Sequence, residues 1–145
     1  MRVLLPLAPL ALALALTSAV SASVTEFQVV VHPSVQGARI SRANLAALFT
    51  GRTDRWGDKT KALPVDQSSR APVRRAFASS VIGLSIGELQ MFWQRRVVSD
   101  RVFPPPIKDS DDEVLLFVAA NAGAVGYVTA GAAIPDDVKV VAVVD

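Results

Sequence analysis

A basic stretch in the middle of the chain is the segment best suited to bind an anion. It reads LPVDQSSRAPVRRAF, residues 63–77, and contains Arg70, Arg74 and Arg75. Pro72 is typical of the first position of a helix, so the arginines surround a predicted helix start. That end of a helix favours anions and disfavours cations. Two explanations are open: an anion-binding site, or a surface turn that happens to be basic.

The same stretch offers the donors that a small oxyanion needs. A helix start has backbone N–H groups without partners in the helix. Ser68 and Ser69 add hydroxyl donors, and Arg70 or Arg74 can pair with oxyanion oxygens through a bidentate guanidinium. A bound anion would also offset the repulsion between the arginines and the helix end. This interpretation requires the donors near Ser69–Arg74 to converge on one pocket.

Residue types elsewhere give little support for catalysis or for a metal. His32 is the only histidine and there is no cysteine. A histidine base needs a nucleophile and an orienting partner, and the sequence indicates neither, so we expect a protein that is not an enzyme. We expect no metal and no cofactor, because the acidic run 109–113 lacks the spacing of a calcium loop and no phosphate-loop or dinucleotide glycine pattern is present.

The N-terminal segment, residues 1–22, has the layout of a secretory signal peptide. One basic residue precedes a Leu- and Ala-rich run that ends in small residues, which predicts cleavage near Ala22. The alternative is a retained membrane helix, but the apolar run is shorter than the ~20 residues of a full span. We therefore expect residues 23–145 to form one periplasmic domain that does not cross the membrane, and export makes a nucleic-acid partner improbable.

Charge is unevenly distributed along the chain. Lys and Arg outnumber Asp and Glu in residues 23–108, whereas Lys139 is the only basic residue in 109–145. Such asymmetry can indicate an anionic partner. It is equally consistent with two segments that neutralise each other in the folded domain.

Apolar periodicity and helix-start signals predict the elements that must hold the basic stretch. The expected strands cover residues 26–33, 62–67, 123–128 and 137–144, and the expected helices cover 41–51, 72–81, 86–97 and 111–121. Ser85 with Glu88, and Ser110 with Glu113, form predicted capping boxes. Strands that alternate with helices favour an α/β domain, with helices packed on a mixed β-sheet.

Three phrases occur in the order seen in the phosphate-binding proteins of ABC transporters. They are LAALFTGRTDRWGD at 45–58, the basic stretch at 63–77 and NAGAVGYV at 121–128. Together they make the chain resemble the phosphate ABC transporter substrate-binding-like family, in a member about the length of a single lobe. The resemblance implies a periplasmic-binding-protein-like lobe of the type II fold. In such lobes backbone N–H groups and hydroxyls at a helix start hold the anion.

The resemblance implies a non-enzymatic solute-binding protein with phosphate or a similar oxyanion as ligand. The candidate ligand-binding residues are Ser68, Ser69, Arg70, Arg74 and Ser34, the last placed just after the first strand. Membrane components of an ABC transporter or another envelope protein are the further candidate partners.

Two departures from the family pattern favour an alternative function. The family has Ser-Gly-Thr where this chain has SRAP, residues 69–72, and Pro72 lacks an N–H donor. The chain is also close to the length of one lobe, whereas full receptors clamp ligand between two. The alternative is a ligand-free interaction or sensor module of the cell envelope, in which the basic half is a docking face.

Overall fold

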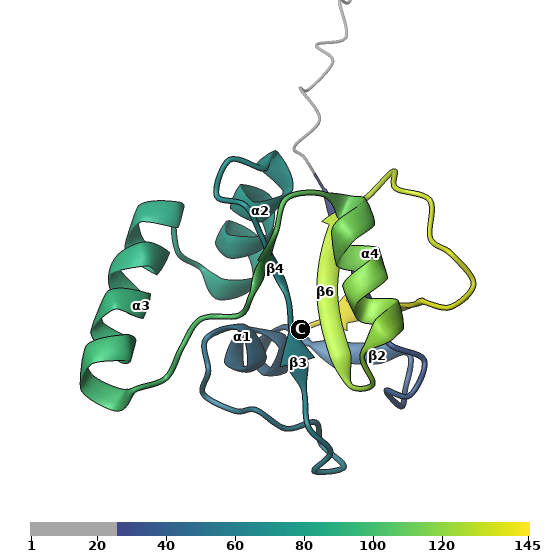
Figure 1. Ribbon diagram of the computed structural model, residues 1–145, viewed down its shortest axis with the longest axis horizontal. Coiled ribbons are helices and arrows are strands. Elements are labelled where there is room, and N and C mark those ends of the chain that lie inside the picture. The colour runs from purple at the N-terminus through teal and green to yellow at the C-terminus, as the bar shows by residue number, and fades with distance from the viewer. Residues whose placement is uncertain (1–25) are drawn as a thin grey trace, which may run out of the picture.

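The computed structural model describes residues 26–145, in which two β-sheets are combined with helices (Figure 1). The strands are β1 Phe27–Val31, β2 Arg39–Ser41, β3 Leu63–Pro64, β4 Asp66–Gln67, β5 Ile107–Lys108, β6 Ala124–Thr129 and β7 Lys139–Val144. The helices are α1 Arg42–Phe49, α2 Pro72–Phe77, α3 Ile86–Asp100 and α4 Asp111–Ala120, and a π-helical turn, Ala78–Ile82, continues α2.

The larger sheet is mixed and has the strand order β2-β7-β1-β6-β3. Its central strand, β1, pairs antiparallel with β6 and β7, while β2 and β3 are parallel edge strands. The separate pair β4 and β5 is parallel. The prediction of an α/β domain with a mixed sheet is therefore confirmed.

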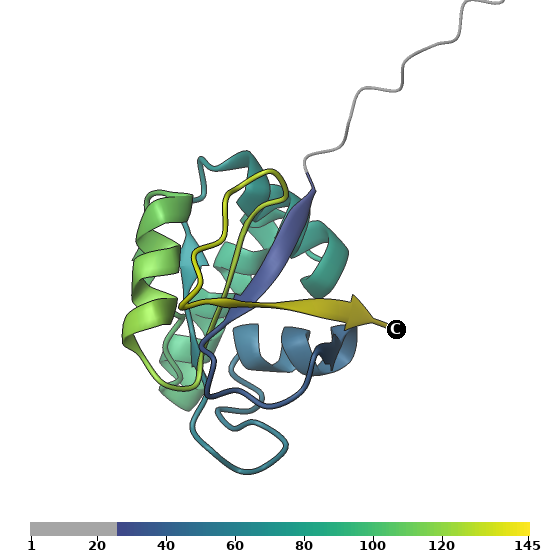
Figure 2. The same ribbon diagram turned by 90° about the vertical axis from the view of Figure 1, so that its right-hand side faces the viewer.

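Helices cover both faces of the larger sheet (Figure 2). On one face α1 and α2 pack through a core that contains Leu45, Phe49 and Phe77, and on the other α4 packs through Val114 and Val118. These buried apolar side chains supply the main stabilisation of the fold. Helix α3 lies to the side, where a third cluster joins it to the π-helical turn.

The helix starts follow the sequence signals. The Ser41 side chain accepts a hydrogen bond from the Asn44 amide, and Ser85 with Glu88 forms a complete capping box. Ser110 accepts from the Glu113 amide, but the Glu113 carboxylate accepts from the Asp109 amide instead of closing the box. The predicted starts of these three helices are confirmed.

The expected strand at 62–67 serves two sheets. The Val65 N–H donates to the Val125 carbonyl in the larger sheet, and the next N–H, that of Asp66, donates to the Pro106 carbonyl beside β5. Successive N–H groups of an extended chain point in opposite directions, so the segment changes partners at this step. The connection 103–108, which lies outside the strands predicted from the sequence, accordingly contributes the short strand β5.

Two further expectations concern the helix over 72–81 and the membrane. The helix expected over 72–81 is regular only to Phe77 and then widens into the π-helical turn, which ends at Gly83 with a φ of +78°. No helix in residues 26–145 is long and apolar enough to cross a membrane. The predicted signal peptide lies outside the described residues and stays a prediction.

Candidate functional site

The basic stretch forms a tight turn that leads from β4 into α2. The Ser68 N–H donates to the Lys108 carbonyl at 3.0 Å, which fixes the turn to β5, and the Ala71 N–H donates to the Ser68 carbonyl at 2.9 Å. The Ser68 hydroxyl accepts a bond from the Arg70 N–H at 3.3 Å. Because this hydroxyl acts as an acceptor in the turn, its proton remains free to be donated.

The start of α2 is not capped by a protein side chain. Its N-cap residue is Ala71, which has no side-chain acceptor, and Pro72 has no N–H. The Arg74 N–H is already bonded to the Ala71 carbonyl. Among the described residues, the N–H groups of Ser69 and Val73 have no acceptor. The turn therefore presents two free amides next to two hydroxyls.

Arg74 points into the protein rather than out of it. Its side chain is 10% exposed and pairs with the equally buried Asp66, with Nη2 at 3.3 Å from Oδ2. Nη1 donates to the Gln67 carbonyl at 2.7 Å, and Nε is buried without a partner among the described residues. The guanidinium thus holds the end of β4 and is largely neutralised by a carboxylate.

Asp66 belongs to a buried network that the sequence analysis did not identify. The Tyr127 hydroxyl donates to its carboxylate, and the Gln67 N–H donates to the same oxygen at 2.8 Å. Burial raises the pKa of Asp66, and the Arg74 charge and the two hydrogen bonds oppose that rise only in part. Burial and the nearby Asp66 also raise the pKa of Tyr127, so the phenol stays protonated as a donor.

The three arginines do not converge on one pocket, so the expected cluster of guanidinium groups is not observed, and the amides, the hydroxyls and Arg70 are the donors left at the turn. Ser69 and Arg74 line a pocket of about 580 Å³ whose other walls come mainly from α3. Arg75 lines a different pocket together with Phe27. Arg70 is exposed. The repulsion between the arginines and the positive start of α2 is reduced because Arg74 is buried against Asp66, while Arg70 and Arg75 lie on the surface.

Ser34 lies away from this turn, beyond the opposite end of β1. Its hydroxyl accepts from the Gly123 N–H at 3.1 Å and lies 2.8 Å from Nδ1 of His32. The five residues of β1 separate it from the α2 end by roughly 16 Å of extended chain. Ser34 therefore links the segment after β1 to the residue before β6. It does not lie with Ser68, Ser69 and Arg70 at the turn.

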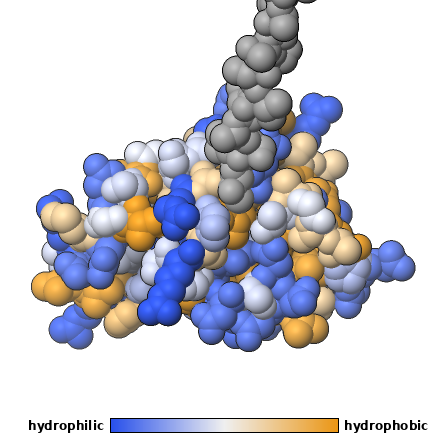
Figure 3. All heavy atoms as spheres, turned by 90° about the horizontal axis from the view of Figure 1, so that it is seen from above, coloured by the Kyte–Doolittle hydropathy of each residue, from blue (hydrophilic) through white to orange (hydrophobic). Residues whose placement is uncertain are grey.

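The surface at the end of the molecule where β1 starts is mixed in character. Figure 3 views the end of the molecule at which β1 starts, and strongly hydrophilic side chains lie there beside apolar ones. Within residues 26–145, no group of three or more His, Cys, Asp or Glu side chains is arranged to hold a metal ion. The chemistry available at the turn is hydrogen-bond donation from amides, hydroxyls and one exposed guanidinium.

Comparison with solved structures relates this fold to phosphate receptors. An ABC-type phosphate transport receptor from Vibrio cholerae superposes with a TM-score of 0.63 at 19% identity, over 82% of this chain and 46% of the receptor. PstS from Borrelia burgdorferi gives 0.63 and 19%, over 83% and 49%. A phosphate-bound protein of Clostridium perfringens, assigned as a phosphate ABC transporter substrate-binding protein, gives 0.64 and 18%, over 82% and 45%.

Sequence comparisons add no closer relationship. No protein-family model matches the chain, and no curated protein matches it. The chain spans slightly less than half the length of the solved proteins that it superposes on. Its described domain thus has the fold of phosphate ABC transporter substrate-binding proteins, as the sequence phrases predicted.

Proposed function

We propose that the protein is a non-enzymatic periplasmic solute-binding module of the phosphate-receptor type. Its ligand is phosphate or a similar small oxyanion, bound at the turn between β4 and α2. The observation that carries this proposal is the open turn, where the Ser69 and Val73 amides have no acceptor within residues 26–145 and α2 has no side-chain cap. Free backbone amides at the start of a helix form an anion-binding site that recurs in many proteins.

The turn residues have distinct roles in this proposal. Ser68 and Ser69 donate their hydroxyl protons, and Arg70, which is exposed, supplies the positive charge. Arg74 is a positioning residue, because its guanidinium is bonded to the Gln67 carbonyl and to Asp66. Ser34 is left out of the site because its hydroxyl accepts a hydrogen bond from the Gly123 N–H beyond the opposite end of β1.

The small number of donors at the turn predicts modest affinity. Pro72 has no N–H, and the Arg74 guanidinium is already paired with Asp66. We expect a dissociation constant of about 0.1–1 mM for phosphate. The export signal predicted at residues 1–22 would deliver the domain to the periplasm, where membrane components of an ABC transporter are candidate partners.

Titration calorimetry with phosphate tests the proposal. The wild-type protein should bind, and Arg70→Gln should weaken binding about tenfold, because a hydrogen bond to a charged group contributes about that much. Arg52→Gln is the matched control, since Arg52 is also exposed but follows α1. The proposal fails if millimolar phosphate gives neither heat nor a thermal shift, or if both variants lose the same affinity.

A second candidate function, a ligand-free interaction module of the envelope, is favoured by a specific observation. Arg74 is neutralised by Asp66 and Pro72 offers no N–H, so the turn has fewer donors than a phosphate receptor would use. The exposed Arg70 and Arg75 would then dock an acidic partner.

Charge reversal separates the two functions. Arg70→Glu with Arg75→Glu should abolish phosphate binding in the first case. In the second, wild type shows no phosphate binding at all, and the same double variant loses a partner that wild type captures from envelope extract. Retention of that partner by the reversed variant would count against the interaction module.

A further inference from the structure

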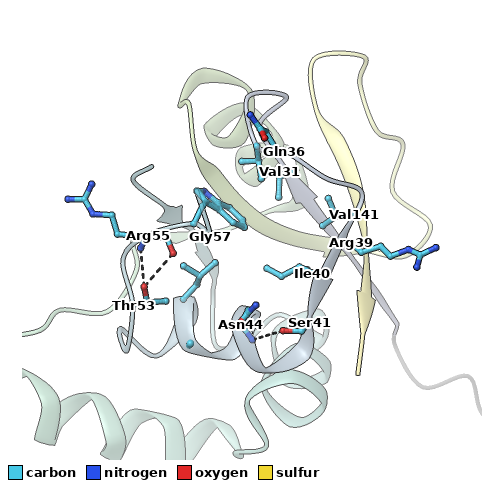
Figure 4. Close-up of a pocket in the computed structure, with 14 residues that line it drawn as sticks. Val31, Gln36, Arg39, Ile40, Ser41, Asn44, Thr53, Arg55, Gly57 and Val141 are labelled. Atoms are coloured by element: carbon cyan, nitrogen blue, oxygen red, sulfur yellow. Dashed lines mark hydrogen bonds between the residues drawn. The ribbon is translucent and has the colours of Figure 1, made fainter. Parts of the chain in front are cut away.

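A second pocket, of about 600 Å³, lies at the other end of the sheet (Figure 4). It is enclosed by the loop after β1, by β2, by α1 and by the loop 53–57. Its volume is within the range of small-molecule sites, about 300–1,000 Å³. The five residues of β1 separate it from the turn before α2, so the two sites are independent.

The floor of this pocket is apolar. Val31, Leu48 and Val141, each buried to at least nine-tenths, line it together with Ile40, whose side chain points into the space in Figure 4. One wall is Trp56, whose indole Nε1–H is bonded to the Gly123 carbonyl at 2.9 Å. A ring held in this way offers a rigid apolar surface. The floor and this wall suit the apolar body of a ligand.

The rim carries side-chain donors that have no partner in the part of the chain that the structure describes. The side chains of Gln36, Arg39 and Asn44 line the pocket and form no hydrogen bond to another described residue. Figure 4 shows the Asn44 amide directed into the pocket, whereas the guanidinium groups of Arg39 and Arg55 point outward on opposite sides of it. The rim therefore has unused capacity to bind acceptor atoms.

The charge of the pocket has one sign. Its lining includes the two arginines and no Asp or Glu. The acids nearest in sequence are already engaged: Asp54 pairs with Lys61 at 2.8 Å and lies 3.8 Å from Nε of Arg55, and Asp58 accepts from the Thr60 hydroxyl. Both arginines are exposed and extend from the rim. The Arg39 side chain has no partner among the described residues, so it can turn toward an anionic group at the opening. Arg55 would first release the Lys59 carbonyl, to which its Nη1 donates at 3.3 Å.

We propose that this pocket binds a small amphipathic organic anion, a carboxylate with an apolar body. The body lies against Leu48, Ile40 and the Trp56 ring, and the carboxylate accepts hydrogen bonds from Asn44 and from one of the two rim arginines. The recognition differs from that of the turn before α2, where inorganic phosphate suffices as the ligand.

An NMR titration of the uniformly ¹⁵N-labelled protein tests the proposal with defined probes. Phenylacetate should produce saturable shifts at the Trp56 indole N–H and at the side-chain amides of Asn44 and Gln36. The Trp93 indole should not shift, because Trp93 lines a different pocket. Acetate, which lacks the body, and phenethylamine, which reverses the charge, should each bind at least about tenfold more weakly.

Variants assign the binding to the rim. Arg39→Gln combined with Arg55→Gln should weaken phenylacetate about tenfold, and Ala47→Leu, which fills the pocket, should abolish the Trp56 shifts. Arg52→Gln and Arg70→Gln are the matched controls. Both variants should bind phenylacetate as the wild type does and show the same Trp56 shifts. The absence of saturable shifts at millimolar phenylacetate, or equal binding of phenethylamine, overturns the proposal.

Discussion

The position of Arg74 in the structure changes the interpretation of the basic stretch. In the sequence it is one of three arginines around a helix start. In the structure its charge is buried against Asp66, and its Nη1 holds the Gln67 carbonyl. A buried ion pair contributes little net stability, but breaking one partner away is costly because the other charge remains buried. Arg74 is therefore a structural residue that shapes the turn.

This account predicts strong coupling between the two buried partners. Arg74→Met should lower the free energy of unfolding by about 3–5 kcal/mol, because it leaves Asp66 without its cation. In the Asp66→Asn background the same substitution should cost clearly less. Urea unfolding of the four proteins of this double-mutant cycle measures the coupling. Additive losses would show that the pair is not coupled.

The pH dependence of stability gives a second prediction at Asp66. Burial raises the pKa of this carboxyl above its usual 3.8, so the folded protein binds the proton more tightly than the unfolded chain does. Stability contributed by the protonated form is then lost as pH rises from about 4 through the folded pKa.

The stability of the wild type relative to Asp66→Asn should therefore fall over that window, because the variant does not titrate at this position. Urea unfolding at a series of pH values measures the difference. A rise of the relative stability with pH would mean that Arg74 and the Tyr127 hydroxyl outweigh the burial of the carboxylate.

At the scale of single residues, the sequence predicts interactions between neighbours in the chain but not contacts between distant residues. Ser68, Ser69 and Arg70 could be chosen because helix-start chemistry depends on neighbours in the chain. The contact of Asp66 with Tyr127 spans 61 positions, and no local pattern encodes it. Ser34 was grouped with the turn because the sequence does not tell at which end of β1 a loop residue lies.

At the scale of elements, the approach of α4 to the sheet depends on one residue of β6. A Cβ at Gly126 would lie 2.7 Å from Val114 Cγ1 of α4 and 2.8 Å from Val65 Cγ1. Real Cβ atoms do not approach other atoms so closely. Helix α4 and Val65, which joins β3 to β4, can therefore pack here only against glycine.

Gly126→Ala should accordingly force α4 away from β6. We expect a loss of about 1–3 kcal/mol in the free energy of unfolding, as for other overpacked cores. Gly131→Ala is the control, because its Cβ would meet nothing within 4 Å, and it should change stability by less than about 0.5 kcal/mol. Thermal and urea unfolding measure both. Equal stability of the two variants would contradict the close packing.

Helices were predicted more accurately than short strands, for a physical reason. The starts of α1, α3 and α4 are set by local caps, which the sequence displays. The strands β2 and β5, of three and two residues, exist because distant strands supply hydrogen-bond partners. The change of partners after Val65 likewise depends on tertiary structure.

At the scale of the whole molecule, the chain has the fold of phosphate receptors but under half of their length. The strand order β2-β7-β1-β6-β3 places the turn before α2 and the pocket beside α1 at opposite ends of β1. The two sites that we propose, one for a small oxyanion and one for an amphipathic anion, are therefore separate in this fold.

The most direct test of the oxyanion site is a ¹⁵N-resolved NMR titration with inorganic phosphate that follows backbone amides. The account predicts saturable shifts of the Ser69, Arg70 and Val73 amides, with the amides around Asn44 unaffected. Unchanged Ser69 and Val73 amides at millimolar phosphate, or shifts confined to other parts of the chain, would contradict it.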